Sequence, residues 1–98
     1  MRSALLCAAA LLAVPAMADE IVASNGTDSV TLSDSQCSSD KVLEKIDPGI
    51  RAHLKDAIAV IGGQSLKACW LVDGKAAHLV YEDGDEGIVP LSEFRKPG

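Results

Sequence analysis

Apolar and polar residues alternate over most of the second half of the chain. The alternation runs through 65–72, 75–82 and 88–91, and a compact apolar run at 57–61 precedes it. Alternation is typical of strands with one buried face, and a short apolar run rich in β-branched residues also favours a strand. The pattern therefore predicts an antiparallel meander of about four strands.

Turn-forming residues separate these segments. Gly62-Gly63 ends the first strand, and Asp73-Gly74 is a favoured dipeptide for a two-residue hairpin turn with positive φ at both central positions. A further turn is expected at 83–87. Pro90 donates no backbone hydrogen bond, so the last strand is predicted to be an edge strand, with Phe94 packing back onto the sheet.

The residues before the meander predict a short strand and one or two short helices. Alternation at 29–33 indicates a strand that leads to Cys37, and helical spacing with capping residues follows at 41–46. Asp47-Pro48-Gly49 interrupts it, and helical spacing resumes at 50–56. The predicted fold is a small α+β domain with its helices at the N-terminal side.

The strand at 65–72 has two distinguishable faces. Leu66, Ala68, Trp70 and Val72 share one face, whereas Lys67, Cys69 and Leu71 lie on the other. Large side chains are scarce, because the chain contains one Trp, one Tyr and one Phe. We therefore expect Trp70 in the core.

The amino terminus has the features of a secretory signal peptide. Arg2 precedes an apolar run at 4–14, and small residues surround a predicted cleavage site after Ala18. The run is too short to span a bilayer, which takes roughly 20 residues. We expect a signal peptide at 1–18, a flexible polar leader at 19–28 and a single domain at 29–98, located in the periplasm or secreted, without a membrane span.

Export determines how the three cysteines are interpreted. Cys7 leaves with the signal peptide, and Cys37 and Cys69 remain as an even pair in an oxidising compartment. We predict a structural disulfide between them, worth roughly 3 to 4 kcal/mol in the chain-entropy model. A redox-active or metal-binding pair is the alternative, and it typically requires closer spacing, such as C-x-x-C.

Charge and motifs argue against several functions. The net charge of −5 disfavours nucleic acid and anionic membrane surfaces as partners. No G-x-S-x-G elbow or comparable signature brings a nucleophile and a base together, and His53 and His78 are interpreted as surface residues. We expect no catalytic residue, no cofactor and no metal site.

The acidic turn at 82–86 and the tyrosine before it are the candidate binding residues. The candidate residues are Tyr81, Asp83, Asp85 and Glu86. A half-exposed tyrosine beside an acidic turn is a common contact residue at protein interfaces. We predict a non-enzymatic interaction module for an envelope or secreted protein partner. The alternative is a small-ligand or divalent-cation binding protein that uses the turn from Glu82 to Glu86.

The chain also resembles a group of small secreted proteins of Gram-negative bacteria and their phages. The resemblance rests on Cys37, Ala68-Cys69-Trp70, Tyr81-Glu82-Asp83-Gly84-Asp85 and Ile88-Val89-Pro90-Leu91 through Phe94, and it spans roughly 32–94. It implies a periplasmic or secreted protein, and it implies no activity and no site residues.

Overall fold

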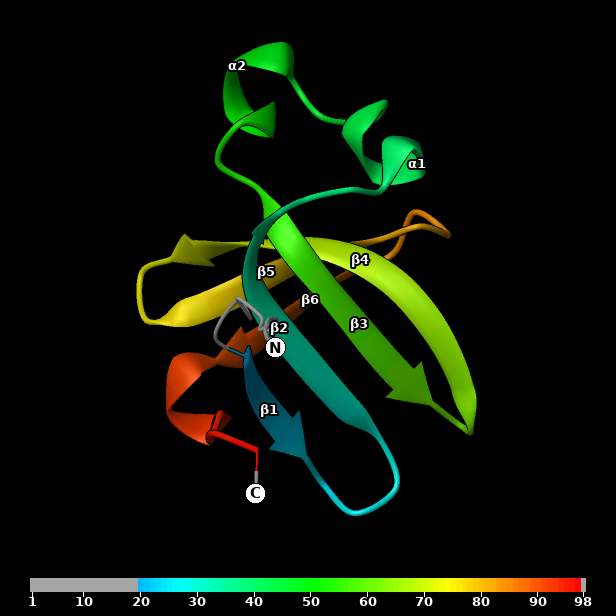
Figure 1. Cartoon of the computed structure of the whole chain (residues 1–98), viewed down its shortest axis with the longest axis vertical. Coiled ribbons are helices and arrows are strands. Elements are labelled where there is room, and N and C mark those ends of the chain that lie inside the picture. The colour runs from blue at the N-terminus through cyan, green and yellow to red at the C-terminus, as the bar shows by residue number, and fades with distance from the viewer. Residues whose placement is uncertain (1–19, 98) are drawn as a thin grey trace, which may run out of the picture.

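The computed structural model describes residues 20–97 (Figure 1). They form six strands, two single-turn helices and one 3-10 helix. In chain order the elements are β1 (Glu20–Ser24), β2 (Ser29–Gln36), α1 (Asp40–Leu43), α2 (Pro48–Arg51), β3 (Lys55–Ile61), β4 (Gln64–Asp73), β5 (Ala76–Tyr81), β6 (Glu86–Pro90) and η2 (Leu91–Glu93).

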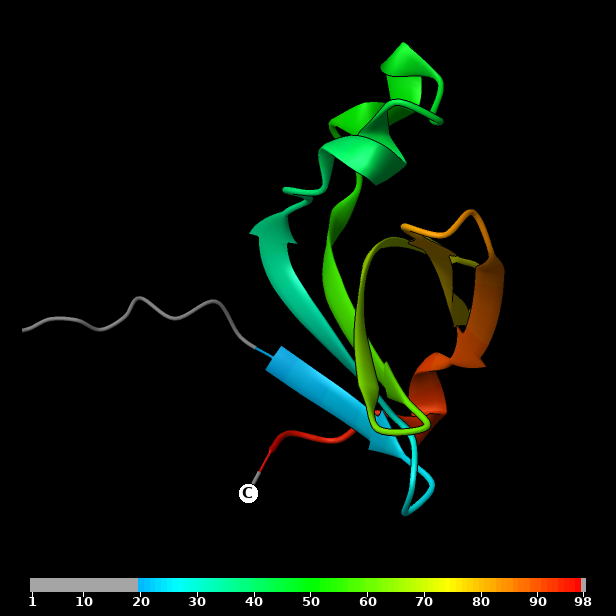
Figure 2. The same cartoon turned by 90° about the vertical axis from the view of Figure 1, so that its right-hand side faces the viewer.

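The strands form one antiparallel sheet in the order of the sequence, from β1 to β6. The sheet curls into a half-barrel, with α1 and α2 at one end (Figure 2). After η2, Arg95 exchanges two backbone hydrogen bonds with Val22 of β1, of 2.7 and 2.9 Å. The predicted α+β fold with about four strands is therefore wrong, because the protein is mostly β and its helices are single turns.

Strand β1 lies where the sequence predicted a flexible leader. Its residues pair with β2, from Glu20 opposite Ser33 to Ser24 opposite Ser29. The polar residues 25–28 indicated a leader, but they form the turn of a hairpin. Ile21 and Ala23, which precede them, face the core. The predicted signal peptide, residues 1–18, lies outside the described residues.

The inner face of the half-barrel holds the main core. Alternate residues of the strands point inward, and Leu32, Trp70, Leu79 and Phe94 supply its large buried side chains. Five alanines complete the buried inner surface: Ala23, Ala57, Ala59, Ala68 and Ala77. Trp70 is 9% exposed and Phe94 7%, so their predicted places in the core are confirmed.

A second, smaller core covers part of the outer face. Cys37 and Cys69 are bonded, with their Cα atoms 5.5 Å apart, which confirms the predicted disulfide. Val42 of α1 and Leu54 pack fully buried against it. The helical arm between β2 and β3 is thus fixed to the outer side of β4.

Both helices differ in extent from the sequence prediction. Helix α1 begins after Ser39, whose Oγ accepts a hydrogen bond from the Val42 N–H. Asp47 caps α2 and Pro48 occupies its first turn, so the expected helix break is a helix start. Lys55, predicted to be helical, lies opposite Trp70 in β3 because strand pairing outweighs one isolated helical turn.

Two hairpin turns fix the register of the central strands. Gly62 and Gly63 both have positive φ and form the two-residue turn between β3 and β4. In the next hairpin Asp73 pairs with Ala76, so the central residues are Gly74 and Lys75. The predicted turn at Asp73-Gly74 is therefore one residue too early.

Within residues 20–97, no helix is long and apolar enough to span a membrane.

Candidate functional site

The side chains of the acidic turn point in different directions. The Ser39 hydroxyl donates a hydrogen bond of 2.6 Å to the Glu82 carboxylate, and the Lys45 ammonium donates to the Glu82 carbonyl oxygen at 3.2 Å. Glu86 lies on β6, where its carboxylate is 2.7 Å from Nε2 of His78. Both glutamates are therefore engaged with other elements.

Tyr81, Asp83 and Asp85 lie together, as the sequence suggested. They line a hollow of about 340 Å³, whose wall is completed by the β3–β4 hairpin through Ile61, Gln64, Ser65 and Leu66. Glu86 does not line this hollow. We call this depression the acidic hollow.

Backbone hydrogen bonds hold the turn that carries the two aspartates. The Tyr81 N–H donates to the Asp85 carbonyl at 2.8 Å, and the Gly84 N–H donates to the Tyr81 carbonyl at 3.0 Å. The Asp83 carboxylate accepts from the Asp85 N–H at 2.9 Å, as Asp commonly does in tight turns. One carboxylate oxygen of Asp83 is thus committed to the turn.

The Tyr81 ring lies against a glycine of the neighbouring strand. A Cβ atom added to Gly87 would lie 3.0 Å from the phenol oxygen, which is too close without movement of the ring. Glycine at this position therefore allows the ring to lie across β6 beside the two aspartates.

The electrostatic environment of Tyr81 is negative. Burial raises the pKa of the phenol above its ordinary value, and the charges of Asp83 and Asp85 raise it further. The charges of Asp83 and Asp85 therefore reach the Tyr81 phenol, and the Lys45 ammonium lies on the other side of the turn, where it donates to the Glu82 carbonyl oxygen.

A second hollow adjoins the first, because Ile61 lines both. It measures about 190 Å³, and Ala23, Val30 and Val89 form its apolar part. Asp28 and Glu93 supply carboxylates, and the Gly62 N–H donates to Asp28 Oδ1 at 3.1 Å. No Lys, Arg or His is among the described residues that line either hollow. We call the two hollows together the acidic mouth.

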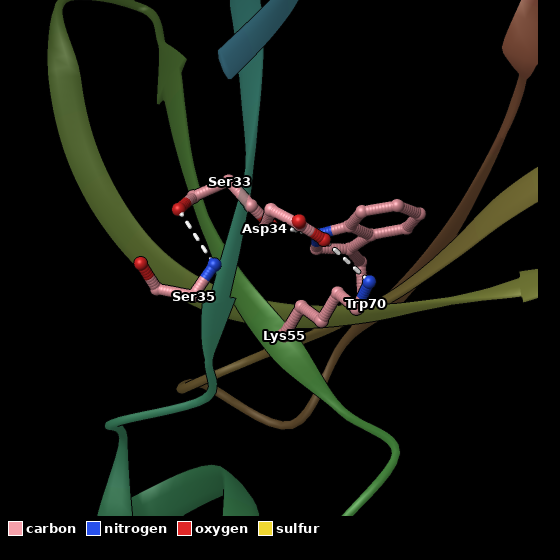
Figure 3. A network of polar contacts seen from close by, with 5 residues as sticks. All are labelled: Ser33, Asp34, Ser35, Lys55 and Trp70. Carbon is pink, nitrogen blue, oxygen red and sulfur yellow. Dashed lines mark hydrogen bonds and ion pairs between the residues drawn. The ribbon is translucent and has the colours of Figure 1, made fainter. Parts of the chain in front are cut away.

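Trp70 marks a different end of the sheet. Its indole N–H donates to the Ser33 carbonyl at 2.9 Å, and the Lys55 ammonium contacts Asp34 and lies 5.9 Å from the ring centroid (Figure 3). The register between β2 and β3 shifts between Leu32 and Gln36, so Ser33 has no paired residue on β3. A groove of about 450 Å³ lies beside this network, lined by Ile50, His53, Lys55, Trp70, Leu71 and Val72.

One potential metal-ligand cluster occurs in the described part of the chain. It consists of Cys37, Asp56 and Cys69, whose ligand atoms lie within 4.8 Å of one another. The two sulfurs are bonded to each other, and the Ser38 N–H donates to Asp56 at 2.7 Å. In the disulfide form this cluster does not offer thiolate ligands.

Comparison of the chain with protein-family models, curated proteins and solved structures found no significant match. The fold and the site define a small, mostly β half-barrel with an acidic, partly apolar mouth.

Sequence reasoning named the tyrosine and the aspartates of the mouth but missed its walls. Ile61 and Leu66 read as ordinary strand residues, and Asp28 as part of a leader. The alternation of apolar and polar residues along each strand indicated which side chains face the core. It could not indicate which strand ends meet, because that depends on the curl of the whole sheet.

Proposed function

We propose that the protein is a non-enzymatic periplasmic or secreted binding module. Its acidic mouth holds a segment of a partner protein that carries basic and apolar residues. The apolar run near the amino terminus and the disulfide support the exported setting. The resemblance to small secreted proteins of Gram-negative bacteria and their phages fits the same setting.

The single observation that carries the proposal is the composition of the mouth. Asp28, Asp83, Asp85 and Glu93 surround apolar side chains, and no cationic side chain lines the hollows among the described residues. A carboxylate rim attracts Lys and Arg, whereas an apolar floor with a tyrosine favours protein side chains over a hydrated ion.

The engagement of the glutamates favours a protein partner over a divalent cation. Glu82 and Glu86 contact Ser39 and His78, and Asp83 already accepts a backbone hydrogen bond. A calcium site takes six to eight oxygen ligands around one point. The carboxylate oxygens of the turn are instead directed toward different partners.

A charge-matched pair of variants tests the proposal. The probe is a synthetic peptide of alternating leucine and arginine, and its affinity is measured by calorimetry at low ionic strength. Asp83→Asn with Asp85→Asn keeps the turn acceptor and removes two charges. We expect the affinity to fall about twofold to thirtyfold, because two exposed charge pairs are lost and each contributes roughly 0.2 to 1 kcal/mol.

The control variant combines Glu44→Gln with Asp73→Asn, which removes the same charge from exposed residues outside the mouth. We expect it to bind as the parent protein does. Equal losses in both variants would mean attraction by net charge alone, and the proposed site would be abandoned. Retention of an envelope protein by the parent but not by the Asp83/Asp85 variant would identify the natural partner.

A further inference from the structure

The turn between β1 and β2 contains Asn25-Gly26, with its polar groups arranged around the asparagine side chain. Ser24 pairs with Ser29 at the base of the turn, and the Asn25 N–H donates to the Asp28 carbonyl at 3.1 Å. The asparagine and the glycine are both exposed. The sequence contains no other asparagine.

Three donors converge on the side-chain oxygen of Asn25. The Asp28 N–H lies 2.9 Å from Oδ1, the Thr27 N–H 3.1 Å and the Thr27 hydroxyl 3.2 Å. Donors placed where negative charge develops stabilise an oxyanion, as in enzymes that attack carbonyl carbons. The amide carbon of Asn25 is thereby polarised toward a nucleophile.

The neighbouring backbone nitrogen is the available nucleophile. Gly26 carries no side chain, and the space where a Cβ would stand is open to 4 Å. Its N–H donates to Ser24 Oγ at 3.2 Å, and its φ of 101° is a conformation that glycine adopts readily. Asn25 and Gly26 are both exposed to solvent.

We propose that Asn25 is a self-modification site and that the folded β1–β2 turn accelerates its deamidation. Hydroxide removes the Gly26 amide proton, and the nitrogen forms a bond to Asn25 Cγ while the carbonyl electrons move to Oδ1. The intermediate then collapses, the bond from Cγ to Nδ2 breaks, and ammonia leaves with a proton from water. Water opens the resulting cyclic imide to aspartate or isoaspartate.

The product changes the acidic mouth. Ser24, Asn25 and Asp28 line its second hollow, so conversion of the amide adds a carboxylate there. Isoaspartate also lengthens the backbone of a turn that holds β1 in register with β2. The effect on partner binding rests on the proposed function, whereas the chemistry at Asn25 does not.

Mass spectrometry of the full chain tests the chemistry directly. The folded protein and the same chain reduced and unfolded in urea are incubated at mildly alkaline pH, and conversion of the 25–26 peptide is followed over time. We expect the folded protein to react about fivefold faster or more, the gain of one well-placed hydrogen bond. A folded rate equal to or below the unfolded rate would overturn the proposal.

Variants at Thr27 test the role of the donors. Thr27→Val removes the hydroxyl donor at nearly constant volume, and we expect the folded rate to fall about fivefold. Thr27→Ser keeps the hydroxyl and should restore it, and Thr31→Val makes the same change in a strand outside the turn. If Thr27→Val reacts at the parental rate, the turn does not promote the reaction.

Discussion

Removing the disulfide is expected to destabilise the protein strongly. Cys37 follows β2, and Cys69 lies in the middle of β4, so the bond joins the helical arm to the outer face of the sheet. The outer core otherwise contains two fully buried side chains, Val42 and Leu54. This small cluster has little apolar area with which to replace the crosslink.

The magnitude follows from the loop that the bond closes. The cysteines are separated by 32 positions. For a loop of this length, the chain-entropy model gives about 3 to 4 kcal/mol at 25 °C. Small domains have a total free energy of unfolding of about 5 kcal/mol or somewhat more, so the bond accounts for a large share of it.

Urea unfolding followed by fluorescence measures this loss. Trp70 is the single tryptophan of the chain and lies in the inner core, so its emission reports on the sheet. The double variant Cys37→Ala/Cys69→Ala is expected to unfold at a urea concentration roughly 2 to 3 M lower than the parent protein.

A reductant supplies the matched control. It should lower the midpoint of the parent protein to near that of the variant, and it should leave the variant unchanged. If the parent and the variant unfold at midpoints within roughly 0.5 M of each other, the crosslink contributes little, and packing of Val42 and Leu54 holds the arm.

Three further changes test the inner face and the mouth. Trp70→Phe removes the donor to the Ser33 carbonyl and should cost about 1 to 3 kcal/mol in unfolding followed by circular dichroism. Ala68→Leu overfills the inner face of β4 and should cost about 1 to 3 kcal/mol in the same assay, whereas an unchanged midpoint would show spare volume. Burial and the two aspartates of the acidic turn raise the pKa of Tyr81 above 10.0. The contribution of the protonated phenol to the free energy of unfolding is therefore complete below pH 10.0, and it is lost as the pH rises through the folded-state pKa. Removing the two aspartates should move the midpoint of the tyrosinate absorbance titration to lower pH, and an unchanged midpoint would contradict their electrostatic role.

The central strands were predictable because their alternation is local. The faces assigned to Trp70 and Cys69 are confirmed, since each lies in the core on its own side of β4. The position of a hairpin turn depends less on the local sequence, because the pairing of the two strands also determines it. Pairing of Asp73 with Ala76 keeps Val72 opposite Ala77, so the turn shifts by one residue from the favoured dipeptide.

Strand β1 was not predictable from its composition. Glu20–Ser24 is short, lies near the amino terminus and is followed by a polar turn. It is held by β2 on one side and by the bridge from Val22 to Arg95 on the other. The second of these contacts joins segments at opposite ends of the chain, and no local pattern indicates it.

The alanines of the inner face link the core to the mouth. Small side chains such as Ala57, Ala68 and Ala77 allow the curled strands to approach across the half-barrel. Beside this alanine-rich surface, the larger side chains of Ile61, Leu66 and Tyr81 line the acidic hollow. A sheet with larger inner residues would need to open its curvature or bury those side chains. The acidic mouth therefore lies at the edge of this alanine-rich core, and the turn from Tyr81 to Asp85 adds carboxylates to its wall.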